Sequence, residues 1–106
     1  MRVGSVAVML CAAAAGPAAA QPEAAGRQKA QACAVCHGSQ GISNVPDAPN
    51  LAGQPAMYLG KQLRAYRSGE RRHEVMSVMA KPLTDADIEA LAAWYASIKV
   101  EASLPK

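Results

Sequence analysis

The pentapeptide Cys33-Ala34-Val35-Cys36-His37 constrains this chain more than any other feature. Its Cys-x-x-Cys-His order is the attachment pattern of c-type haem. The two thiols can each form a thioether to a porphyrin edge, and the histidine that follows is carried under the ring, where its imidazole can bind iron. A bare Cys-x-x-Cys would fit a zinc knuckle, a redox dithiol or an iron–sulfur ligand equally well. The adjoining histidine therefore predicts one covalent haem c, attached at Cys33 and Cys36, with His37 as an iron ligand.

The N-terminal segment has the pattern of a secretory signal peptide. Met1-Arg2 supplies a positive charge, residues 3–15 form an apolar run without charges, and Ala18-Ala19-Ala20 offers small residues for cleavage. The apolar run is short for a transmembrane helix. We therefore expect residues 1–20 to be removed, residues 21–106 to form one domain, and no stable membrane insertion afterwards. An uncleaved N-terminal anchor is the alternative.

The cysteines raise two further alternatives. Cys11 lies in the segment expected to be removed, and the bulky Leu10 before it is unlike a usual lipid-attachment box. Exported thiols can also oxidise to a disulfide. A Cys33–Cys36 disulfide is therefore the main alternative to haem attachment.

The chain is poor in large apolar side chains, with no Phe and one Trp. Small domains often need a metal, disulfides or a cofactor to stabilise a limited core. A covalently held porphyrin would supply the missing apolar body. The formal net charge of +3, less the charge of Arg2, is far below what a nucleic-acid-binding domain carries, so no nucleic acid partner is expected.

The pattern of helix formers and breakers predicts an all-α domain with one long loop. Good helix formers cover residues 24–34 and lead into the cysteines. Residues 38–53 are rich in Gly, Pro and Asn and indicate the loop. Pro55 suits the first turn of a second helix and Gly69 suits its C-terminal end. Residues 71–82 are expected to form another connection.

The last helix is predicted to start at Thr84-Asp85-Ala86-Asp87, because Thr84 can cap it and the acids favour its positive end. Apolar residues then repeat at helical spacing, at Ile88, Leu91, Ala92, Tyr95 and Ile98, with Trp94 beside them. No period-two run long enough for a strand is present.

The ordered series of motifs resembles class I c-type cytochromes, specifically one haem domain of the periplasmic dihaem cytochrome c4 type or its monohaem relatives. The matching runs are residues 33–38, 49–54, 58–63, 66–69, Met76 and residues 83–95. The resemblance implies a small class I cytochrome c fold, with helices wrapped around one haem. The dihaem relatives carry a second haem domain, whereas this sequence has a single Cys-x-x-Cys-His. The chain is therefore expected to work alone or to obtain a second haem from another chain.

The resemblance implies Met76 as the second axial iron ligand, because Met76 precedes Leu83 at the spacing where the family places its methionine. A thioether opposite imidazole stabilises ferrous iron and raises the reduction potential. Met79, His73 and an open iron position are the alternatives. Met57, near the start of the second helix, is expected to pack in the core.

The resemblance also implies roles for residues around the haem. Pro49 matches the family proline whose carbonyl accepts the Nδ1 proton of the haem-binding histidine, although an ordinary loop proline would look the same. Gly26 would let the first helix cross the last at close range, with Trp94 packed on it. Tyr95 would face the haem.

A run of basic residues has two interpretations. Its members are Lys61, Arg64, Arg67, Arg71 and Arg72. A solvated helix face is one interpretation, and a docking patch for an acidic redox partner is the other.

These features predict an electron carrier that works by outer-sphere transfer in the periplasm and is not an enzyme. No residue set resembles a hydrolytic triad or a paired-carboxylate site. The implied partners are donor and acceptor redox proteins, such as a periplasmic oxidoreductase or a terminal oxidase. The alternative is a haem c subunit bound tightly to a periplasmic redox enzyme. An enzyme or gas sensor with an open iron position is a third hypothesis.

Overall fold

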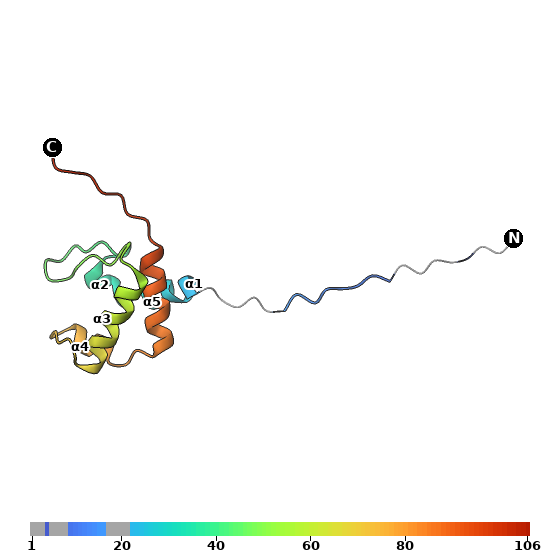
Figure 1. Cartoon of the computed structure of the whole chain (residues 1–106), viewed down its shortest axis with the longest axis horizontal. Helices are drawn as coiled ribbons and strands as arrows, with labels where there is room; N and C mark the ends of the chain where they lie inside the picture. The colour runs from blue at the N-terminus through green and yellow to red at the C-terminus, as the bar shows by residue number, and fades with distance from the viewer. Residues whose placement is uncertain (1–3, 5–8, 17–21) are drawn as a thin grey trace.

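The computed structural model describes residue 4, residues 9–16 and residues 22–106 of the chain. Within them the structure is helical, without strands, as the sequence predicts (Figure 1). The helices are α1 (Pro22–Lys29), α2 (Ala34–His37), α3 (Ala56–Ser68), α4 (Met76–Ala80) and α5 (Asp85–Ser97). None of these helices is long and apolar enough to cross a membrane. The expected cleavage after Ala20 falls outside the described residues.

Helix α5 is the centre of the packing. It lies against both α1 and α3, while α4 packs against α3. In Figure 1, α2 with the loop after it and α4 lie towards opposite ends of α3. The main buried cluster comprises Ala30, Leu59, Leu91, Ala92 and Tyr95. The cysteine motif packs on this cluster through Cys33, whereas α4 joins the domain through α3.

The contact between α1 and α5 depends on a glycine. Gly26 is buried, and a Cβ built on it would lie 2.6 Å from the Trp94 Cβ and would overlap the Ala90 carbonyl oxygen. Because real Cβ atoms do not approach so closely, only glycine allows the two backbones to cross here. The predicted close crossing at Gly26 and Trp94 is confirmed.

The predicted ends of α3 and α5 are also confirmed. Pro55 is the N-cap of α3, and Gly69 is its C-cap with a left-handed φ of 85°. Thr84 caps α5: its side chain accepts from the Asp87 amide, and the Asp87 carboxylate accepts from the Thr84 amide.

Two local predictions were wrong. The helix expected over residues 24–34 ends at Lys29, and bonds of the i→i−3 kind tighten the chain from Gln31 to Cys33 before α2 begins. The connection expected over residues 71–82 contains α4. The sequence gives no strong local signal for α4, because a helix of this length is not stable without tertiary contacts.

Candidate haem site

The His37 imidazole is buried and oriented by a backbone carbonyl. His37 ends α2 and is 7% exposed. Its Nδ1 lies 2.8 Å from the Pro49 carbonyl oxygen, the hydrogen bond that the resemblance implies for this proline. Since that carbonyl can only accept, Nδ1 carries the proton and donates it. The Nε2 atom is therefore the nitrogen left to bind a metal.

The loop that brings Pro49 to His37 is held by two polar side chains that the sequence analysis did not identify. The Asn50 side-chain oxygen accepts from the Ser43 amide at 2.7 Å, and the Ser43 hydroxyl donates to the Cys36 carbonyl at 3.0 Å. These bonds fold the loop back onto α2. The only available sequence signal was that Asn50 directly follows Pro49, and this position does not reveal that the Asn50 side chain bonds to Ser43.

The two motif cysteines are free thiols. Cys36 is exposed, while Cys33 is half-buried and packs against the main cluster. Burial raises the pKa of the Cys33 thiol, and the nearby Tyr95 hydroxyl opposes part of that rise. No disulfide joins the pair, which leaves both sulfurs available for thioethers.

Tyr95 provides a test of whether these residues suit a haem. Its side chain is 3% exposed, and its hydroxyl has no hydrogen-bond partner of good geometry among the described residues, although the Cys33 thiol is near. Burial raises the pKa of Tyr95 above its usual range, so the group stays a neutral donor. A buried unpaired hydroxyl is costly unless a further group completes the site. A buried imidazole with a free Nε2, two free thiols and this hydroxyl fit a covalently bound haem.

The methionines differ clearly in exposure. Met76, the first residue of α4, is half-buried, whereas Met79 is 41% exposed. Met57 is 87% exposed, so the expectation that it packs in the core is wrong. Its position at the start of α3 faces away from the cluster that Leu59 joins. Assignment of Met76 as the ligand stays a prediction, which its greater burial favours.

The ring nitrogens of His73 are both engaged. Its Nδ1 accepts from the amides of Val75 and Met76, at 3.2 and 3.3 Å, and its Nε2 lies 3.4 Å from a carboxylate oxygen of Asp47. These contacts disfavour the alternative in which His73 binds iron.

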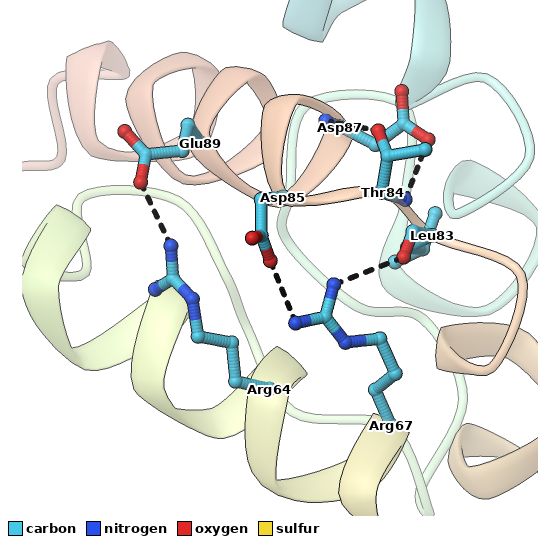
Figure 2. A network of polar contacts seen from close by, with 7 residues as sticks. All are labelled: Arg64, Arg67, Leu83, Thr84, Asp85, Asp87 and Glu89. Carbon is cyan, nitrogen blue, oxygen red and sulfur yellow. Dashed lines mark hydrogen bonds and ion pairs between the residues drawn. The ribbon is translucent and has the colours of Figure 1, made fainter.

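The basic run contributes to the packing of α3 against α5. Arg64 pairs with Glu89 at 2.7 Å, and Arg67 pairs with Asp85 at 2.6 Å (Figure 2). The hydrogen bond from Arg67 holds the pKa of Asp85 below its usual value. Arg67 also donates to the Leu83 carbonyl at 3.1 Å. Both arginine side chains remain partly exposed, Arg64 at 42% and Arg67 at 30%, as expected of a solvated face, and each also pairs with an acid across the helix contact.

Comparison with known proteins identifies the fold family. The family model described as cytochrome c matches residues 23–99. The chain is 45% identical over 101 residues to a thiosulfate dehydrogenase electron acceptor from Thiomonas intermedia, which covers 93% of this chain and 43% of the relative. It is 44% identical over 77 residues to cytochrome c-554(548) from Halomonas halodenitrificans, covering 70% of this chain and 93% of the relative.

A solved structure supports the same assignment. Reduced recombinant cytochrome c4 from Pseudomonas stutzeri superposes with a TM-score of 0.70 and 28% identity, over 74% of this chain and 48% of that one. The chain thus spans less than half the length of the Thiomonas relative and of this cytochrome c4. The cytochrome c family binds haem c covalently through a cysteine pair, and Cys33 and Cys36 have that spacing.

Proposed function

Because the chain belongs to the cytochrome c family, we propose that it is a monohaem electron carrier of the bacterial periplasm, without catalytic activity of its own. One observation carries the proposal. The buried His37 imidazole donates its Nδ1 proton to the Pro49 carbonyl, which leaves Nε2 free beside two free thiols. This arrangement suits an iron porphyrin and no hydrolytic chemistry.

When bound, haem c supplies the one-electron chemistry of its iron. Cys33 and Cys36 would attach it, and His37 and Met76 would hold its iron. The Pro49 carbonyl keeps the His37 ring in one orientation and makes it a better donor. The chain itself would thus supply both protein ligands of the iron, His37 and Met76.

Haem attachment can be tested by separate replacement of the cysteines, in a host competent in cytochrome maturation. The wild-type haem should resist extraction with acidified acetone, and its pyridine haemochrome should have the two-thioether spectrum. Cys33→Ser and Cys36→Ser should each give at most a one-thioether spectrum. Cys11→Ser is the matched control and should leave the spectrum unchanged. Extractable haem in the wild-type protein, or a colourless product, would refute the proposal.

Location in the periplasm follows from the N-terminal pattern. We propose that cleavage after Ala20 releases residues 21–106 as the mature chain. Mass spectrometry of protein from the periplasmic fraction should give a chain that begins at Gln21. A chain that retains Met1, found in the membrane fraction, would favour the uncleaved anchor instead.

The second candidate is a haem c subunit bound tightly to a redox enzyme. The similarity to a protein named a thiosulfate dehydrogenase electron acceptor favours it. Purification from the native host at moderate salt separates the two candidates. A carrier should elute as a free monomer, whereas a subunit should elute with its enzyme.

An acidic redox partner, whether donor or acceptor, would dock on cations that are not already paired within the chain. Lys61 and Arg72 are exposed and make no ion pair within the described residues. Lys61→Glu combined with Arg72→Glu should slow electron transfer with an acidic partner at low salt, and the difference should fade as salt rises. Lys99→Glu, a charge reversal near the C-terminal end, is the matched control.

A further inference from the structure

His73 lies between α4, which carries the proposed ligand Met76, and the loop that orients the other proposed ligand, His37. On one side, its Nδ1 accepts from the amides of Val75 and Met76 at the start of α4. On the other side, its Nε2 faces Asp47, which precedes Pro49 in the loop that orients His37. No other described residue has a side chain that makes hydrogen bonds or ion pairs to both segments.

The hydrogen bonds define the tautomer of the His73 ring. An Nδ1 that accepts from two backbone amides carries no proton, so the proton of the neutral ring lies on Nε2 and points to the Asp47 carboxylate. The Asp47 side chain is 90% exposed, and exposed pairs of this kind contribute little. The main effect of His73 therefore lies at α4.

Helix α4 needs this support because of its length. It has five residues, and the side chain of its N-cap, Val75, makes no capping hydrogen bond. The first amides of any helix lack partners within the helix. His73 satisfies two of them, and Ser77 completes the arrangement by accepting from the His73 amide at 3.0 Å. His73 and Ser77 thus form hydrogen bonds that hold the backbone before and after Met76.

We propose that His73 is a positioning residue: its Nδ1 holds the first turn of α4 in the conformation that presents Met76 to the iron. The proposal rests on the assignment of Met76 as the ligand. Loss of a side-chain cap typically costs about 1 kcal/mol, which corresponds to about a fivefold change in an equilibrium. Without the Nδ1 acceptor, the form in which Met76 has left the iron should be about five times more populated.

Three substitutions at position 73 separate the functions of the two ring nitrogens. The side-chain oxygen of His73→Asn can occupy the Nδ1 position, whereas the amide of His73→Gln can reach the Nε2 position but not Nδ1. His73→Ala removes both. Asp47→Asn tests the loop contact. Glu74→Gln is the matched control, because Glu74 is the exposed neighbour of His73 and its side chain makes no hydrogen bond or ion pair within the described residues.

The measurement uses ferric holoprotein with its haem content verified by pyridine haemochrome. Cyanide binding to such a protein requires the methionine to leave, so its rate reports the open form. His73→Gln and His73→Ala should bind cyanide about five times faster than wild type, with a weaker methionine-to-iron charge-transfer band in the near infrared. His73→Asn, Asp47→Asn and Glu74→Gln should remain within about twofold of wild type.

Two results would overturn the proposal. In the first, His73→Gln and His73→Ala bind cyanide at the rate of Glu74→Gln. In the second, His73→Asn is as fast as His73→Ala, which would assign the effect to ring packing and not to the Nδ1 acceptor. Failure of the Met76 assignment is recognised separately, since Met76→Ala would then keep the charge-transfer band whatever residue stands at position 73.

Discussion

The two sides of the site are held in different ways. On the His37 side, the ligand itself is oriented by the backbone: Nδ1 donates to the Pro49 carbonyl, and Gly38 turns the chain immediately after the ligand with a φ of 84°, while the Ser43 and Asn50 side chains hold the loop farther out. On the Met76 side, side chains hold both ends of the short helix: His73 accepts from the amides at the start of α4, and Arg67 donates to the Leu83 carbonyl beyond its end.

This difference predicts that the two sides of the site differ in rigidity. Backbone turns next to the ligand are hard to alter without disrupting the fold, whereas side-chain bonds can be removed singly at modest cost. We therefore expect the His37 side to stay rigid and the Met76 side to open first under stress. The outer elements that carry few buried contacts are generally those that unfold locally.

The largest expected effect is complete loss of the methionine ligand. Met76→Ala should abolish the near-infrared charge-transfer band, lower the reduction potential and open the iron to cyanide or carbon monoxide. The haem should nevertheless remain attached, because the thioethers to Cys33 and Cys36 are covalent and do not depend on the methionine. Met79→Ala is the matched control and should keep the band. Loss of the band in Met79→Ala alone would transfer the ligand assignment to Met79.

Gly38→Ala should destabilise the His37 side by about 3 kcal/mol, measured by denaturant unfolding. An added Cβ would overlap the Ile42 carbonyl oxygen, in a backbone conformation that L residues rarely adopt. Gly69→Ala is a close control, because its φ is 85° and nothing lies within 4 Å of the new Cβ. It should cost only about 1 kcal/mol. Equal costs at the two positions would show that the close backbone approach at Gly38 is unimportant.

Arg67→Ala should weaken the attachment of the segment after α4. Loss of its charged hydrogen bond to the Leu83 carbonyl should cost about 1.5 kcal/mol. Arg64→Ala is the control, since Arg64 forms only an exposed pair with Glu89, worth at most about 1 kcal/mol. Unfolding curves of the two variants and of wild type measure the difference. If Arg64→Ala is the more damaging of the two, the Leu83 bond is not what holds this segment.

The smallest expected effect concerns the stability of the folded protein at low pH, and it comes from Asp87 in α5, outside the His37 and Met76 sides of the site. Hydrogen bonds from Lys29 and the Thr84 backbone lower the pKa of Asp87 from 3.8 to about 2. A pKa depressed on folding gives stability that is present above 3.8 and is lost as the pH falls towards 2. Asp87→Asn should therefore be less stable than wild type at neutral pH, with the difference vanishing near pH 2. Glu101→Gln, in the exposed C-terminal tail, should match wild type throughout.

Some features could be predicted because their causes are local in the chain. The cysteine motif, the Pro55 and Gly69 ends of α3, and the Thr84–Asp87 cap of α5 each depend on residues a few positions apart. The Gly26 crossing came from the resemblance to a family and not from a local rule. A short motif dictates chemistry or backbone geometry wherever it is placed, so the sequence alone determined the cofactor class and the helical architecture.

The tertiary structure decided what depends on distant partners. The sequence offered Arg64 and Arg67 as a surface run, and only the contact of α3 with α5 turned them into ion pairs. It offered His73 as a possible ligand, and only the approach of Asp47 and the fold of α4 occupied both ring nitrogens. A side chain can bond any complementary group that the fold brings within about 3 Å, and one-dimensional spacing does not specify which group that is.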